Sequence, residues 1–397
     1  MVLQRNHDVR LAALALDSAS AAVIIANAPP NPTLSVQTAG ISRSRGIGSG
    51  DLRNKTFDTV VGISQLVERG GKRDLRTKNA LALEDASRLD VGDAVRQQRI
   101  AASDAYFELL GSQERLRISD ELLIFSEHSL AIADRRLKAG DLAASEAARV
   151  RVDDLRVRND LSQSRADLFK AQLALALLTG AEGPAQNMIA VDPWPDLGNI
   201  INDDLADEEL NQRTQARADV MAARRRTEAA RFARDSALAL RKSDVTVGVQ
   251  YEHYPSTISN PQGSGNTVGL SIQIPLQTRY DFRGEIRNAE AALNSAQETE
   301  DKIRAIARSE IEARNAELHR SADQALRYHR DLLPSARRVA IAAEFAFSNG
   351  ATGVSELLDA RRTDRAIQAE AIAADAAYAK ARLAWDIETS ASKELHE

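Results

Sequence analysis

The feature of this sequence that most constrains its fold is an internal repeat of very long period. Asp8-Val9 recurs as Asp219-Val220, and Val61-Gly62-Ile63-Ser64 recurs as Val268-Gly269-Leu270-Ser271. The two offsets are 211 and 207 residues, far longer than the period of a solenoid repeat. The offsets therefore indicate that the 397-residue chain arose by duplication of one large unit.

The two halves predict the same order of elements. Each half begins with a helix, continues with two strands joined by a Gly/Ser/Asn-rich loop, and ends with a very long helix and a return helix. The expected helices cover 4–28, 72–139 and 141–179, then 203–241, 281–349 and 353–392; the expected strands cover 33–44, 54–67, 244–255 and 266–276. We assign residues 1–180 to the first repeat and 203–397 to the second. Pro and Gly residues concentrate in 181–202, which we interpret as the linker.

A seven-residue repeat runs through both long helices. In the first half it comprises Leu109, Leu116, Leu123, Leu130 and Leu137. In the second half it comprises Leu318, Ala325, Leu332, Val339 and Ala346. Such a repeat places one apolar seam against a partner helix and predicts left-handed coiled-coil packing. The same seam would suit an ordinary soluble coiled coil, so the seam alone does not indicate a function.

Apolar and polar residues alternate in the predicted strands. In 245–251 and 268–274 every second residue is Val, Leu, Ile or Tyr, and Thr, Gly, Ser or Gln stands between them. This pattern occurs both in transmembrane β-barrels and in half-buried soluble hairpins. Four strands cannot close a barrel, and open sheet edges are not tolerated in lipid. If the strands span a membrane, several chains must therefore combine.

Composition excludes several classes of function. Cysteine is absent, so the chain has no disulfide and no thiolate metal site. The net charge of -5 argues against nucleic-acid binding. Gly46, Gly48 and Gly50 lie between two predicted strands, where a nucleotide-binding loop is not expected. Because no nucleophile–base constellation is evident, we expect neither an enzyme nor a bound cofactor.

The histidines carry no metal-binding pattern. They are scattered along the chain and none pairs at the spacing of four residues that would place two ligands on one helix face. We expect them to be solvated or structural rather than metal ligands. They are His7, His128, His253, His319, His329 and His396.

No segment predicts a membrane-spanning helix. The most apolar stretch, 11–28, is interrupted by Asp17 and by serines, whereas a spanning helix needs about 18 or more apolar residues in a row. We expect a helix rich in small residues there. A basic-then-apolar export signal is also absent, and we expect this chain to be a mature or trimmed form.

Several motifs along nearly the whole chain carry a family resemblance. They are Pro30-Asn31-Pro32, Arg136-Leu137-Lys138-Ala139-Gly140, the stretch from Val268 to Leu276 with the following Arg283-Gly284-Glu285-Ile286, and Phe347-Ser348-Asn349-Gly350 followed by Ser355 and Leu358-Asp359-Ala360. They resemble the motifs of TolC-like outer membrane efflux proteins, and are most similar to the CzcC/CnrC-like heavy-metal efflux branch.

The resemblance implies an α+β membrane protein. Three chains would contribute four strands each to a trimeric, twelve-stranded transmembrane β-barrel, continuous with a long periplasmic α-helical coiled-coil barrel. The homotrimer would lie in outer-membrane lipid and act as the passive exit duct of a tripartite efflux system. Its partners would be a periplasmic adaptor protein and an inner-membrane pump of the RND type, and its cargo heavy-metal cations.

Two other functions remain open at this stage. A periplasmic adaptor also contains long helical hairpins, but adaptors normally present one hairpin, whereas duplication here predicts two. A soluble coiled-coil scaffold would leave the four alternating strands without explanation.

The resemblance also implies an adaptor-docking site at the two glycine turns that end the longest helices. The residues that match the docking pattern are Arg136, Leu137, Gly140, Ser145, Gly350, Ser355, Leu358 and Asp359. Glycine directly after a helix is also common for purely conformational reasons.

Charged residues near the same turns are candidates for a gate. Three-fold symmetry would turn each lumen-facing charge into a ring of three, and rings of carboxylates attract cations. The candidates are Asp134, Asp141, Glu344, Glu356, Arg361 and Arg362, together with Arg135 and Asp359. A solvated tip whose charges only maintain solubility is the simpler interpretation.

Overall fold

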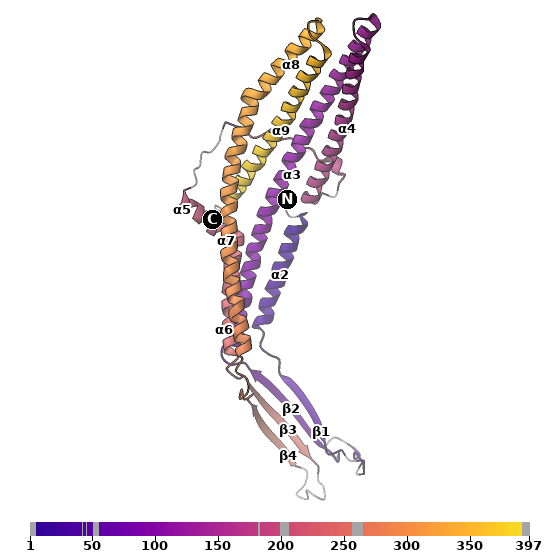
Figure 1. Ribbon diagram of the computed structural model, residues 1–397. Helices are drawn as coiled ribbons and strands as arrows, with labels where there is room; N and C mark the ends of the chain where they lie inside the picture. The colour runs from indigo at the N-terminus through magenta and orange to yellow at the C-terminus, as the bar shows by residue number, and fades with distance from the viewer. Residues whose placement is uncertain are drawn as a thin grey trace. The chain divides into compact units, whose positions relative to one another are not determined.

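The computed structural model describes residues 5–41, 43–44, 46–50, 55–181, 183–198, 206–255 and 265–390. Its elements are, in chain order, α2 (His7–Asn27), β1 (Thr33–Ala39), β2 (Asp58–Val67), α3 (Lys72–Ala139), α4 (Ala144–Thr179), the 3₁₀ turn η2 (Ala185–Asn187), α5 (Asp207–Ala216), α6 (Ala218–Ala239), β3 (Val245–Tyr254), β4 (Gly265–Gln273), α7 (Arg283–Arg327), the π-turn η3 (Tyr328–Leu332), α8 (Leu333–Ser348) and α9 (Val354–Ser390) (Figure 1).

The chain forms two compact units, and each takes segments from both sequence repeats. The first unit comprises 1–14, 89–221 and 302–397, and the second comprises 15–88 and 222–301. These bounds differ from the predicted 1–180 and 203–397 because sequence repeats follow the order of the chain, whereas compact units follow packing. The helices α3 and α7 contribute to both units.

The second unit is built on one antiparallel sheet with the strand order β1-β2-β3-β4 (Figure 1). Within the described residues, β1 pairs only with β2 and β4 only with β3, so the sheet has two unpaired edges. One row across the sheet joins Val36, Val61, Tyr251 and Val268 through the strand register. Because side chains alternate between the two faces, this register gathers the apolar side chains on one face.

The apolar face of the sheet is exposed in the single chain. Leu270 is 83% exposed, Val268 is 73% exposed and Leu34 is 66% exposed. On the opposite face, a Cβ at Gly62 would come within 3.1 Å of the Ser35 hydroxyl. Small and polar residues therefore occupy the second face, and the first presents a contiguous apolar surface of the kind that contacts lipid.

Several strands are shorter than their predicted ranges. The strand β1 ends at Ala39 rather than at residue 44, because Gly40 follows with a φ of +74° that an extended strand does not allow. The strand β2 begins at Asp58 rather than at residue 54. Part of the predicted range 54–67 and of the loop between the strands lies outside the described residues.

The helix α3 keeps one heptad register through its length in the first unit. Leu109, Ser112, Ser126 and Ala133 are between 0% and 6% exposed. These serines and this alanine follow the predicted leucine seam by three residues, which is the second seam position of a heptad. Leu137, the last member of the seam, is 37% exposed near the end of the helix.

The second long helix changes register at η3, and the predicted seam is wrong beyond that point. Leu318 and Ala325 are 5% and 0% exposed, but Leu332 and Val339 are 41% and 58% exposed. The buried residues that follow are Ala340 and Phe347, at 1% and 6%. Each lies one residue after a predicted seam position, because a π-turn places one additional residue in the helical turn.

The first unit has an apolar core that the linker helps to cover. Phe107, Leu109, Leu175 and Ala190 belong to one buried cluster, and Trp194 packs against it. The aromatic rings of Phe107 and Trp194 stack, and their centroids are 6.2 Å apart. The described part of the predicted linker 181–202 is therefore packed on the helices rather than extended away from them.

Buried ion pairs connect helices of the first unit. The Arg96 guanidinium of α3 donates to Glu388 Oε1 of α9 at 2.6 Å, and both side chains are less than one-tenth exposed. Removing one member of such a pair leaves an uncompensated buried charge. Loss of either partner is therefore expected to destabilise the packing of α3 against α9.

The predicted helix 203–241 is divided by an extended residue, Arg217, into α5 and α6. The Arg217 guanidinium lies 2.6 Å from Asp219 and 2.8 Å from Glu310. Burial disfavours the charged form of Asp219, but hydrogen bonds and charge from Arg217 outweigh burial and lower the pKa of Asp219.

The helix α2 is long and apolar enough to cross a membrane by length and composition, and only 6% of its most apolar window is buried. Ser20 of this helix donates to Glu84 of α3 at 3.0 Å. Its exposed residues include Leu11, Leu14, Ile24 and Ile25, all at least 61% exposed. The sequence predicted a helix rich in small residues here, and the structure adds that its apolar flank is uncovered within one chain.

Candidate functional site at two hairpin tips

The helices α3 and α4 form one hairpin of the first unit, and α8 and α9 form another. Both turns use the same chemistry. Gly140 has a φ of +83° and Gly350 a φ of +75°. The N–H of Asp141 donates to the Arg136 carbonyl at 2.9 Å, and the N–H of Ala351 donates to the Ala346 carbonyl at 2.8 Å. These bonds define a Schellman motif, whose left-handed residue favours glycine.

The two tips pack against each other through an apolar cluster. Ala133, Leu142 and Val150 come from the first hairpin, and Phe347 and Leu357 from the second, all no more than 8% exposed. Burial of this kind contributes about 25 cal/mol per Å² of apolar surface removed from water. The tips of one chain therefore form a single packed surface.

Polar contacts join the same two tips. The Arg136 guanidinium lies 5.2 Å from the centroid of the Phe347 ring. Arg149 donates to the Ser355 hydroxyl at 2.8 Å. Cation–π contacts at exposed sites contribute about 0.5–1 kcal/mol. Neither Phe347 nor Arg149 was a predicted site residue, although Phe347 stands within the motif that ends at Gly350.

The predicted docking residues form the outer surface of these tips. Leu137, Gly140, Ser145, Gly350, Ser355 and Asp359 are exposed, and Arg136 and Leu358 are partly buried. Among the described residues, apart from each glycine's own chain neighbours, no atom lies within 4 Å of a Cβ built on Gly140 or Gly350. Space for a partner therefore exists around both glycines.

The predicted gate charges divide into paired and solvent-facing groups. Arg362 lies 3.6 Å from Asp359 in its own helix and 3.6 Å from Asp153 of α4. Asp134 accepts from Arg151 at 3.1 Å. Asp141 and Glu356 are exposed at the turns, and Arg135 donates to the Ala131 carbonyl at 3.2 Å.

Arg361 and Glu344 form an ion pair across the α8–α9 hairpin. The Arg361 guanidinium also lies 4.0 Å from the centroid of the Phe125 ring of α3. Arg361 is therefore a link between the hairpins. Sequence reasoning missed Phe125 and Asp153 because the partner of a charged residue on another helix cannot be read from spacing along one helix.

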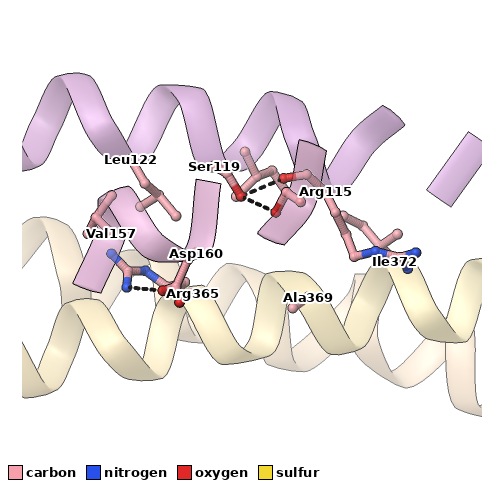
Figure 2. Close-up of a pocket in the computed structure, with 10 residues that line it drawn as sticks. Arg115, Ser119, Leu122, Val157, Asp160, Arg365, Ala369 and Ile372 are labelled. Atoms are coloured by element: carbon pink, nitrogen blue, oxygen red, sulfur yellow. Dashed lines mark hydrogen bonds and ion pairs between the residues drawn. The ribbon is translucent and has the colours of Figure 1, made fainter. Parts of the chain in front are cut away.

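A small cavity lies between α3, α4 and α9. Its volume is about 160 Å³, and its lining includes Leu122, Val157 and Ile372 (Figure 2). The hydroxyls of Ser119 and Ser164, which both line it, are hydrogen-bonded at 2.9 Å. Ligand pockets usually measure about 300–1,000 Å³. This cavity is a packing void rather than a cargo site.

Metal-binding groups do not gather in the described part of the chain, where no three His, Asp or Glu side chains are placed to hold an ion. His329 instead hydrogen-bonds Asp375 at 2.8 Å, and His253 hydrogen-bonds Asn266 at 2.9 Å. His396 lies outside the described residues.

A four-stranded sheet with an exposed apolar face and two long helical hairpins fit the architecture expected of a channel-forming outer-membrane protein. The chain belongs to the outer membrane efflux protein family, whose model matches residues 1–181 and 210–385. It is an outer-membrane efflux channel, and the family match does not favour the adaptor and soluble-scaffold alternatives.

Two relatives and one solved structure illustrate the similarity. The cobalt-zinc-cadmium resistance protein CzcC of Cupriavidus metallidurans is 23% identical over 90% of this chain and 80% of its own length. The cation efflux system protein CusC of Escherichia coli O157:H7 is 25% identical over 91% of this chain and 78% of its own length. A crystal structure of CusC matches with a TM-score of 0.76 at 20% identity, covering 98% of this chain and 90% of that chain.

Proposed function

We propose that this chain forms a homotrimeric exit duct for heavy-metal cations in a tripartite efflux system. The proposed cargo is inferred from the similarity to CzcC and CusC along nine-tenths of the chain. The names of both relatives refer to metals or cations. A duct of this kind conducts cargo through a shared lumen, so it requires no tight metal site on one chain.

The trimer is supported by two surfaces that one chain leaves incomplete. The sheet has unpaired edges at β1 and β4, and an open edge in lipid leaves backbone groups without partners. The flank of α2 exposes apolar side chains. Neighbouring copies of the same chain would pair with the two sheet edges and cover the apolar flank of α2. Light scattering in detergent should give a trimer, and a stable monomer that retains its strands would contradict the proposal.

The cargo is tested in a strain that lacks its own outer-membrane duct and is supplied with a cation-exporting inner-membrane pump and its periplasmic adaptor. Restored resistance to cobalt, zinc, cadmium or copper salts, without restored resistance to organic dyes, supports cation export. Restored resistance to dyes alone would contradict the proposal that the cargo is a metal cation, but it would still support the function as an exit duct.

Adaptor docking at the tips is supported by the exposure of Leu137 and Asp359 and by the open space around Gly140 and Gly350. Asp359→Arg should abolish resistance while trimer level and membrane insertion stay unchanged. Asp167→Arg on α4 is the matched control, since this carboxylate is also exposed and also pairs with a basic residue at 3.3 Å. Full resistance in a Gly140/Gly350 double substitution would count against docking.

Gating by charges at the same tips is the third part of the proposal. Three copies of each lumen-facing charge would form a ring that selects cations. The contact of Arg362 with Asp153 also joins the hairpins of one chain. Neutralising Asp359 with Arg362, or Asp134 with Asp141, should raise the resting conductance in planar bilayers or reduce cation selectivity. Unchanged values in both double variants would exclude a gating role.

A further inference from the structure

The helix α8 carries two apolar stripes, and only one of them is buried. The buried stripe comprises Ala340 and Phe347, preceded by the half-buried Leu333. The other stripe is the predicted seam that continues from α7, with Leu332 and Val339 exposed and Ala346 half-buried. Each member of one stripe lies next in sequence to a member of the other. The same helix could therefore pack through either stripe after turning by one residue, about 100°.

The π-turn η3 selects the present stripe. The N–H of Leu333 bonds to the Tyr328 carbonyl, which is the wider π pattern rather than the α pattern. Pro334 has no N–H, so one carbonyl of the preceding turn lacks an intrahelical partner in either register. The helix is therefore weakest at the turn where the register changes.

Two side-chain contacts hold η3 against α9. His329 Nε2 lies 2.8 Å and 3.1 Å from the two oxygens of Asp375, which is 8% exposed. The adjacent Tyr328 donates to Glu370 at 3.1 Å. A groove of about 1040 Å³ lies beside the turn and is lined by Leu333, Ala340 and His329 among others. Asp375 also lines this groove, so the turn is held to α9 at these contacts and borders open space directly beside them.

If the π-turn became an α-helical turn, α8 would rotate and its C-terminal end would shift. The loop after α8 can adjust to this shift. The loop to α9 contains Gly350 and Gly353, and in the described part of the chain only their own sequence neighbours come within 4 Å of a Cβ built on either glycine. Glycine adopts a wide range of backbone conformations. A turn of α8 by one residue would therefore not require a break in α9.

We propose that α8 is a register switch, in which loss of the π-turn turns the helix so that Leu332, Val339 and Ala346 replace Leu333, Ala340 and Phe347 against α3 and α9. Phe347 then leaves the tip cluster and its contact with Arg136. The switch changes which side chains the tip presents, so a partner that binds exposed Phe347 would favour the turned state. This last consequence rests on the proposed docking at the tips, whereas the switch itself does not.

Cysteine reactivity tests the switch directly, because the chain has no native cysteine. Ala340→Cys should resist maleimide in the purified trimer, since Ala340 is 1% exposed. Exchanging the two tip residues, as Ala346→Phe with Phe347→Ala, moves the large ring into the other stripe. In that background the labelling rate of Ala340→Cys should rise at least about tenfold and that of Val339→Cys should fall.

Deletion of Asp331 provides the matched control. It removes the additional residue of η3 and should hold the present stripe in an uninterrupted α-helix. Ala340→Cys should then stay protected even with the exchanged tip residues. Three results would each overturn the proposal. The first is labelling rates at 339 and 340 that do not change when the tip residues are exchanged, and the second is a rise in both rates together. The third is a rise in labelling of Ala340→Cys in the exchanged background that is as large with Asp331 deleted as with Asp331 present. Because labelling does not depend on export, failure of the switch and failure of the proposed duct are separate results.

Discussion

The two long helices of this chain were predicted to be equivalent, and they differ in one turn. The helix α3 runs for 68 residues without interruption, whereas its counterpart is divided into α7 of 45 residues, η3 of 5 residues and α8 of 16 residues. Ser126 and Ala133 stay buried at the positions expected from the α3 heptad, but Leu332 and Val339 do not stay buried after η3. A heptad predicts burial only where the residue count per turn is constant.

The strongest test of this difference is a one-residue deletion in each helix. Deleting the exposed Asp120 of α3 would turn the rest of the helix by about 100° and remove Ser126 and Ala133 from their buried sites. We expect a loss of about 5 kcal/mol or more, since each misplaced buried side chain costs about 2–5 kcal/mol. Thermal unfolding and limited proteolysis of the trimer would measure this loss.

Deleting Asp331 of η3 is the comparison. It should cost less than about 1 kcal/mol, because the buried stripe of α8 keeps its position when the additional residue is removed. Equal losses in the two deletions would show that the π-turn does not set the register.

A smaller effect is expected where the two hairpin turns are compared. Gly140→Ala should cost about 1–2 kcal/mol, because Gly140 has a φ of +83° that a side chain disfavours. Gly353→Ala should change stability by no more than about 0.5 kcal/mol, since Gly353 has open space and no left-handed backbone. Chemical denaturation of both variants measures the difference. A larger loss at Gly353 would contradict this account of the turns.

The smallest effect concerns the carboxylate that holds η3. Burial raises the pKa of Asp375 above its ordinary value of 3.8, and the neighbouring His329 opposes part of this rise. A raised pKa in the folded state means that the native protein binds this proton more tightly than the unfolded chain does. The contribution of Asp375 to stability is therefore complete below about pH 3.8 and is lost as the pH rises through the folded pKa.

Asp375→Asn should make stability less dependent on pH in that window, as measured by denaturation at a series of pH values. Some dependence will remain in the Asp375 variant because burial also raises the pKa of Asp104 and Asp386. A steeper dependence in Asp375→Asn would contradict the assigned direction.

Much of this fold could be predicted because its signals repeat over many residues. The alternation in 245–251 and 268–274 indicated strands with one apolar face, and the heptad of α3 indicated the burial of Ser126 and Ala133. Family membership and the efflux-channel function are confirmed by the family match over residues 1–181 and 210–385. The docking and gate residues remain predictions, although the structure places them at two tips in contact.

The features that escaped prediction each depend on a single residue or on another helix. Pro334 was the available signal for the irregular turn, and the unbroken heptad spacing concealed it. The break at Arg217 has no Gly or Pro to signal it, and the buried Arg217 guanidinium lies between Asp219 and Glu310. Contacts such as Arg361 with Phe125 join residues far apart in the sequence.

The two unpaired sheet edges also have a genetic consequence. In the proposed homotrimer, one defective chain impairs the whole duct, because each chain's sheet forms part of the shared wall. In a cell that makes intact and defective chains in equal amounts, random association leaves about one complex in eight free of the defect. A variant that still assembles but cannot dock or conduct would therefore act as a dominant allele, whereas one that fails to assemble would be recessive.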